Sequence, residues 1–170
     1  QQGGGFPETL SGSNGAVVMA CLAGLAWIGD GSTLKRGRYK ANLKSAAQFV
    51  LREVGAKNAL SADASWDQTT WGFAHAAIFL GELQLDSKSH EFDKDLQRIA
   101  DTLCQRQEVS GGYGHGPGGK NALGYIELNI LAGYVISGLS LAEQAGCKVD
   151  KQVVDKLLGY CQESAGADGG

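Results

Sequence analysis

Hydrophobic residues divide the chain into helical segments of two alternating kinds. Three segments have small or apolar residues on nearly every side, so the helices they form must be packed on most sides. Three others carry apolar positions at the i, i+3, i+4, i+7 spacing, which predicts one buried face and one wet face. The first kind covers residues 16–28, 72–85 and 126–142, and the second covers residues 39–54, 89–107 and 150–163. No run alternates apolar and polar residues for long enough to make a convincing strand. The chain is therefore predicted to be all-α, with three hairpins. Each hairpin pairs a helix of the first kind, which we call inner, with a helix of the second kind, which we call outer.

The three hairpins are related by a repeat of 57 positions. Three series of residues share this interval: Gly24, Gly81 and Gly138; Gln48, Gln105 and Gln162; Gly55, Gly112 and Gly169. One glycine series would be weak evidence, but three series with the same offset indicate that a unit has been copied. We therefore predict one repeat domain over residues 1–170, with units at approximately 1–55, 56–112 and 113–170.

Residues at the segment boundaries agree with this division. Asp150 precedes the third outer helix and can cap its first turn. Gly55 and Gly146 stand where a helix ends, and they are predicted to adopt the left-handed conformation that a C-terminal reversal requires.

The connection from the second outer helix to the third inner helix contains glutamine, a short spacer, two glycines and an aromatic residue. These are Gln105, Gly111, Gly112 and Tyr113. Paired glycines let the backbone turn sharply between helices. The aromatic side chain can plug the gap between hairpins, and the glutamine can bond backbone groups left without partners at a helix end.

This pattern resembles the repeats of the squalene cyclase and prenyltransferase superfamily, whose members wind inner and outer helices into an α/α toroid. The segment GGYGHG…NALGYIELN is closer still to uncharacterised bacterial proteins that carry such repeats inside much longer chains. Three hairpins would make half of a ring that generally holds about six, and terminal units of such arrays need a covering partner. The resemblance thus implies an incomplete toroid whose partner is the remainder of a longer chain or another copy.

The enzymes of that superfamily use motifs that this chain does not match. The Asp-rich acid motif of class II terpenoid cyclases has no counterpart, and the zinc ligands of protein prenyltransferases cannot be placed. The four cysteines form no cluster at metal-ligand spacing, although Cys104 and Cys161 occupy equivalent positions at which a disulfide is possible. We therefore expect no metal and no cofactor.

Charge and hydropathy narrow the range of partners. A net charge of −3 gives no excess of positive charge of the kind that nucleic-acid-binding proteins carry. The longest apolar stretch, residues 15–29, is shorter than the roughly 20 residues that a membrane span needs. A small molecule, a glycan or a protein remains as the expected ligand.

Candidate site residues gather in the connections that precede the second and third inner helices, which we call the second and third connections. In a toroid these connections would line the mouth of the cavity. His115 lies between glycines, and either His115 or Tyr113 could transfer protons, with Glu127 as the partner. The candidates for ligand binding are Trp66, Asp67, Trp71, His75, Asn121 and Tyr125. Several of them also have a structural interpretation: a loop histidine can simply form hydrogen bonds, Glu127 can make a satisfied structural hydrogen bond, His75 can belong to the core, and the tryptophans can be plugs between hairpins.

Two functional classes follow from these residues. The first is a non-catalytic repeat domain that binds a ligand or protein within a larger secreted or cell-envelope protein. The second is an enzyme, or half of one, acting on a carbohydrate or isoprenoid-like substrate in the cavity. The absence of a nucleophile arrangement, metal cluster or acid motif favours the first. The enzyme interpretation predicts that His115, Tyr125 and Glu127 share one concavity.

Overall fold

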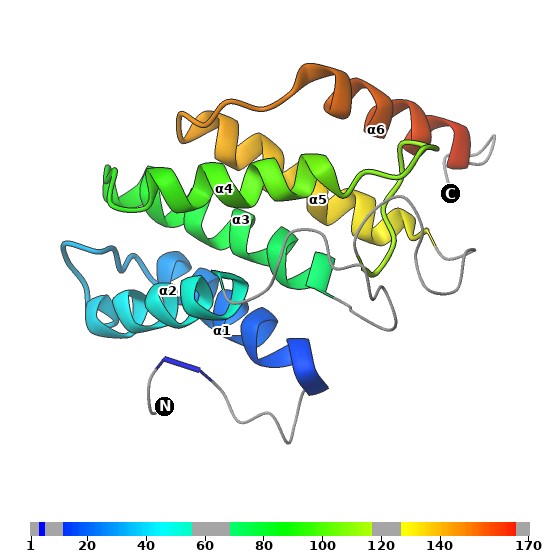
Figure 1. Ribbon diagram of the computed structural model, residues 1–170. Helices are drawn as coiled ribbons and strands as arrows, with labels where there is room; N and C mark the ends of the chain where they lie inside the picture. The colour runs from blue at the N-terminus through cyan, green and yellow to red at the C-terminus, as the bar shows by residue number, and fades with distance from the viewer. Residues whose placement is uncertain (1–3, 6–11, 56–68, 117–126, 166–170) are drawn as a thin grey trace.

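The chain forms helical hairpins, as its hydrophobic pattern predicts. The computed structural model describes residues 4–5, 12–55, 69–116 and 127–165 (Figure 1). Its six helices are α1 (Gly12–Gly29), α2 (Lys40–Gly55), α3 (Thr69–Ser87), α4 (Asp93–Gln105), α5 (Asn129–Gln144) and α6 (Lys151–Ser164). In these residues extended pairing is limited to a single bridge between Gly114 and Glu127. The all-α class is confirmed.

The three hairpins lie side by side, with α3 in the middle of the row of inner helices. Helices α1 and α5 both pack on α3, and each outer helix packs on the inner helix of its own hairpin. In addition, α2 contacts α3 and α4 contacts α5, so these two outer helices each bridge to the following hairpin. Figure 1 shows α1 and α2 at the bottom, α3 and α4 across the middle and α6 at the top.

The helices follow the 57-residue interval with one exception. Advancing α1 by one period gives residues 69–86, which matches α3, and advancing α4 gives residues 150–162, which matches α6. Advancing α2 gives residues 97–112, a range that begins four positions after the first residue of α4. The cause is the connection within the first hairpin, Asp30–Tyr39, which is twice as long as Lys88–Phe92 in the second.

This displacement explains why the prediction for Gly55 is wrong. The period aligns Gly55 with Gly112 in a connection, but the shifted α2 still includes Gly55 as its last helical residue, outside the left-handed region. The prediction for Gly146 is confirmed, with φ of 101°. The Asp150 cap is also confirmed, because its side chain accepts a hydrogen bond of 2.9 Å from the Gln152 amide.

Repeated glycines let the inner helices approach closely. A Cβ atom at Gly24 would collide with the Phe79 ring of α3, and one at Gly81 would lie 2.9 Å from Leu141 Cβ of α5. Gly138 instead faces back towards α3, where its Cβ would lie 2.9 Å from that of Ala77. Since real Cβ contacts are longer, a larger residue at any of these positions would push neighbouring helices apart.

The glycine pair of the third connection packs on the outer helix of its own hairpin. Gly111 has φ of 96°, and a Cβ there would lie 2.6 Å from the Lys156 carbonyl oxygen. At Gly112, a Cβ would lie 2.6 Å from Tyr160 Cε2. The first hairpin repeats this device, because Gly4, also at positive φ, abuts the Ser45 carbonyl and Gly5 abuts the Phe49 ring.

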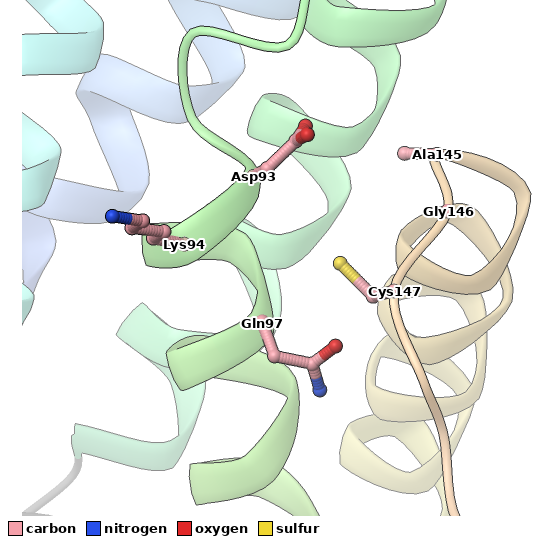
Figure 2. A pocket seen from close by; sticks show the side chains of 6 residues that line it. All are labelled: Asp93, Lys94, Gln97, Ala145, Gly146 and Cys147. Atoms are coloured by element: carbon pink, nitrogen blue, oxygen red, sulfur yellow. The ribbon is translucent and has the colours of Figure 1, made fainter.

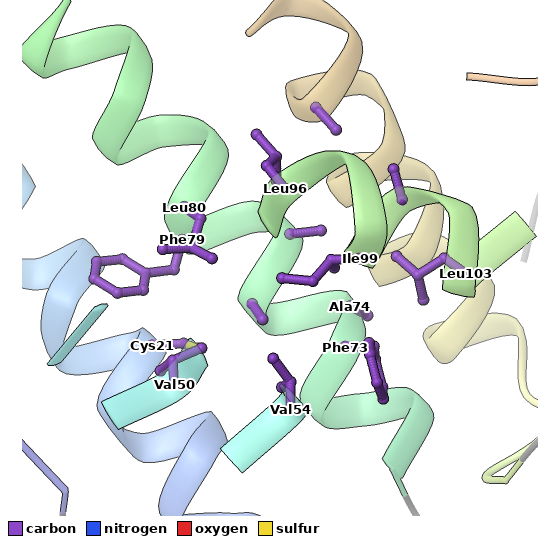
Figure 3. Packing of buried hydrophobic residues seen from close by; sticks show 14 of the residues in the cluster. Cys21, Val50, Val54, Phe73, Ala74, Phe79, Leu80, Leu96, Ile99 and Leu103 are labelled. Atoms are coloured by element: carbon purple, nitrogen blue, oxygen red, sulfur yellow. The ribbon is translucent and has the colours of Figure 1, made fainter. Parts of the chain in front are cut away.

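The hydrophobic core lies between the inner row and the outer helices. Leu96, Ile99 and Leu103 of α4 are fully buried and face Phe73 and Leu80 of α3 (Figure 3). These α4 residues are among those whose spacing predicted the buried face. The predicted segment 89–107 is shortened at both ends, because residues 88–92 form the turn and α4 ends at Gln105.

All four cysteines are free thiols, so the disulfide considered between Cys104 and Cys161 does not form. None of the helices in the described part of the chain has the length and apolar character needed to span a bilayer.

Candidate functional site

Four aromatic or imidazole rings from three separate segments meet at the N-terminal end of α3. Trp71 and His75 stand one turn apart on α3, His115 comes from the following connection, and Tyr134 comes from α5. The Trp71 ring centroid lies 5.9 Å from that of Tyr134 and 6.1 Å from that of His115, and the His75 and Tyr134 centroids are 4.5 Å apart. These separations are typical of packed aromatic pairs. We call these four residues the aromatic-histidine cluster.

Trp71 determines which nitrogen carries the proton in each histidine. Its indole Nε1–H donates to His115 Nδ1 over 2.9 Å, so neutral His115 carries its own proton on Nε2. The Trp71 carbonyl oxygen can only accept, and it lies 2.8 Å from His75 Nδ1. His75 therefore carries its proton on Nδ1 and keeps a lone pair on Nε2. The two imidazoles thus have opposite hydrogen-bonding character at Nε2.

Burial keeps His75 neutral. Its side chain is 5% exposed. Loss of hydration lowers the pKa of His75, an effect that the hydrogen bond to the Trp71 carbonyl only partly offsets. The Nε2 lone pair is therefore present at neutral pH.

A buried hydrogen-bond network holds the connection against α3. The Thr70 amide donates to the His115 carbonyl over 3.1 Å, and the Thr70 hydroxyl donates to the Gly116 carbonyl over 2.8 Å. Arg106 is fully buried and donates to the hydroxyls of Thr69 and Thr70 over 2.7 and 3.0 Å. Its guanidinium also stacks on the Phe73 ring at 4.6 Å. The network thus ties the end of α4 to the start of α3 and places His115 beside Trp71.

The other two candidate catalytic residues, Glu127 and Tyr113, lie elsewhere. Glu127 Oε2 accepts a 2.6 Å hydrogen bond from Ser110 and lies next to Gly112 and Tyr160. Tyr113 is fully buried, and its hydroxyl donates to the Leu103 carbonyl over 3.0 Å. Burial raises the pKa of Tyr113. No hydrogen bond joins His115 to either residue within the described residues.

The structural roles expected of the connection are met only in part. Tyr113 lies in the hydrophobic core, and its hydroxyl ties the connection to α4. Gln105, expected to bond helix-end groups, is exposed; Gln107 instead donates to the carbonyls of Gly111 in the connection and Val153 of α6 over 3.1 and 2.8 Å.

The remaining candidates fall outside the described residues: Trp66, Asp67, Asn121 and Tyr125. Two residues that prove important, Tyr134 and Arg106, were not singled out from the sequence. Tyr134 had a detectable signal, since it is the one aromatic residue in the apolar segment that forms α5. Arg106 had none, because it follows Gln105 in a polar stretch where exposure is the ordinary expectation.

A polar hollow lies between the N-terminal end of α4 and the turn that follows α5. Its volume is about 340 Å³, and Asp93, Gln97 and Cys147 line it together with Lys94, Ala145 and Gly146 (Figure 2). Gln84 and His90 each contact the Asp93 carboxylate at 3.1 Å. Burial, with the charges of Asp93 and Asp101, raises the pKa of Cys147 to about 11, so its thiol stays protonated at neutral pH. In the part of the chain that the structure describes, no group of three His, Cys, Asp or Glu side chains could hold a metal ion.

Comparison with known proteins identifies a family without an assigned activity. Residues 37–167, which run from just before α2 to just beyond α6, match the domain of unknown function DUF6288. No curated protein and no solved structure matches the chain. Because the matched segment covers most of the sequence, the chain belongs to the DUF6288 family.

Proposed function

We propose that this chain is a non-catalytic, ligand-binding repeat domain and that its ligand binds at the aromatic-histidine cluster. One observation carries the proposal: Trp71 fixes His75 and His115 in complementary tautomers beside the half-buried Tyr134 ring. Partly exposed aromatic faces next to a few oriented polar groups are typical of small-molecule sites.

The alternative, an enzyme acting on a carbohydrate or isoprenoid-like substrate, has less support. A proton-transfer mechanism needs a donor and an acceptor within reach of the same reacting group. His115 bonds to Trp71, whereas Glu127 bonds to Ser110 and Tyr113 bonds to Leu103. The candidate catalytic residues therefore do not form one unit, and a binding role fits their positions better.

We also propose that the hairpins form part of an α/α toroid, as the resemblance to squalene cyclases and prenyltransferases implies. The row of inner helices, with α2 and α4 bridging between hairpins, supports this arrangement. Helix α6 buries only Leu157 among its residues, whereas α4 buries five. A further inner helix, from a longer chain or another copy, would cover α6 as α5 covers α4.

Titration monitored by NMR tests the binding proposal. The indole N–H signal of Trp71 is assigned by its loss in Trp71→Phe, and the protein is then titrated with cellotetraose, maltotetraose, chitotetraose and farnesol. We expect at least one compound to shift this signal saturably. The Trp27 indole serves as an internal reference, because Trp27 stacks on Tyr39 in the first hairpin, away from the cluster. If no compound moves the Trp71 signal, the proposal is wrong.

A further inference from the structure

We infer that the ligand of the aromatic-histidine cluster is a neutral saccharide, an inference that rests on the proposed function. The cluster combines two features that a sugar ring needs together. Trp71 and Tyr134 supply flat apolar surfaces, and the two histidines supply hydrogen-bonding atoms of opposite character. A saccharide has an apolar face of C–H groups and a rim of hydroxyls, and each hydroxyl can both donate and accept.

The tautomers specify how hydroxyls would pair. His115 Nε2–H is a donor, so it would bind a hydroxyl oxygen lone pair. His75 Nε2 is an acceptor, so it would take a hydroxyl proton. Neighbouring hydroxyls on one sugar could satisfy both atoms, whereas a ligand with only acceptors or only donors would satisfy one of them.

Among the described residues, the electrostatics of the cluster disfavour charged ligands. Trp71 can donate to His115 Nδ1 only while that nitrogen is unprotonated, and burial disfavours a charge on His75. The charged side chain tied most directly to the network, Arg106, is directed at Thr69, Thr70 and the Phe73 ring rather than at the cluster. A phosphate or an ammonium group would therefore be desolvated here without a counter-charge from the cluster.

A purely apolar ligand fits less well than a sugar. An isoprenoid chain could cover the Trp71 and Tyr134 rings, but it would offer no hydrogen-bonding partner to His115 Nε2–H or His75 Nε2. The site would then discriminate against such a ligand, as sites with buried polar groups generally do.

Calorimetric titration of the whole chain with the three neutral tetrasaccharides, farnesol and farnesyl diphosphate tests this inference. We expect a tetrasaccharide to bind more tightly than either isoprenoid. Trp71→Phe keeps a ring but loses the N–H that fixes His115, and His75→Phe keeps a ring but loses the acceptor. Each variant should weaken saccharide binding by about tenfold, the usual effect of losing one hydrogen bond. Trp27→Phe is the matched control and should bind as the unmodified protein does.

The outcomes separate the two proposals. Binding of farnesol without any tetrasaccharide would overturn the saccharide inference and leave the cluster as a ligand site. Saccharide binding that is unchanged in both Trp71→Phe and His75→Phe would place the sugar elsewhere and also overturn it. No measurable binding of any of the five compounds would reject both proposals. Circular dichroism of each variant verifies folding, and if His75→Phe fails to fold, the half-buried His115→Phe replaces it.

Discussion

Replacing Thr70 by valine removes one hydroxyl from the buried network and leaves the shape of the side chain almost unchanged. In the native chain this hydroxyl donates to the Gly116 carbonyl over 2.8 Å and accepts from Arg106 over 3.0 Å. Arg106 retains its 2.7 Å hydrogen bond to Thr69, so the variant costs two hydrogen bonds and not the whole network. Each buried polar group that loses its partner costs about 1–3 kcal/mol. We therefore expect Thr70→Val to lower the free energy of unfolding by about 2–4 kcal/mol.

Urea denaturation measures this loss, and thermal unfolding should show a fall in Tm of about 5–15 °C. Thr102→Val is the matched control, because Thr102 is also buried but its hydroxyl donates to Arg98 of its own helix. A loss at Thr70 no larger than that at Thr102 would refute the network. The Trp71 indole signal adds a second test, since Thr70 also holds the segment that carries His115. An unchanged signal in a destabilised Thr70→Val would mean that Thr70 does not position the cluster.

Three further changes probe other parts of the structure. Gly112→Ala should destabilise the chain by about 1–3 kcal/mol in urea denaturation, because the new methyl group would overlap the Tyr160 ring of α6. Alkylation of Cys147 by iodoacetamide should accelerate as pH rises towards its pKa of about 11, and Asp93→Asn should raise the rate at pH 8 by up to about tenfold, because it removes a charge that disfavours the thiolate. If another copy covers the last hairpin, Leu158→Glu should convert an associating chain to a monomer in light scattering, since Leu158 is 44% exposed on α6.

Each of these changes has a control in the chain. Gly133 has open space around its Cβ position, so Gly133→Ala should be neutral or stabilise α5 by about 0.5–1 kcal/mol. Asp155→Asn alters a carboxylate that pairs with Lys151 and should leave the Cys147 rate unchanged. Val109→Glu changes a side chain that is 93% exposed in a connection and should not affect association. Equal effects in test and control variants would contradict the corresponding explanation.

The helices could be predicted from the sequence because their determinants are local. Periodicity separates the apolar inner helices from the amphipathic outer ones, and the Asp150 cap depends on a residue two positions away. The period failed at Gly55 because an insertion earlier in the hairpin shifted α2, and no feature of Gly55 itself records that shift.

The site could be predicted only in part, because its members meet through packing. Trp71 and His75 are one turn apart, so their proximity follows from helix geometry alone. Tyr134 reaches them only because α5 packs on α3, and Arg106 becomes buried only because α4 ends against the start of α3. Neither contact is encoded in a short stretch of sequence.

The repeat distinguishes the scaffold from the site. Residues that stack the hairpins recur: Gly24 and Gly81 each admit a side chain from the next inner helix, and two glycine pairs pack on their outer helices in the same way. The cluster does not recur. One period before Trp71, His75 and Tyr134 stand Asn14, Val18 and Ala77, and one period after Trp71 and His75 stand Leu128 and Ala132.

Because α1 and α3 pack together without such rings at the equivalent positions, the cluster is not required for joining one hairpin to the next. A residue set that departs from the repeat, contains oriented histidines and keeps two aromatic rings partly exposed is better explained by binding than by stacking. Replacing Trp71, His75 and Tyr134 together by Leu, Ala and Ala, the residues found one period away, should therefore preserve the helical fold by circular dichroism while abolishing saccharide binding. Loss of the fold in this variant would show instead that the cluster is a structural part of the α3–α5 interface.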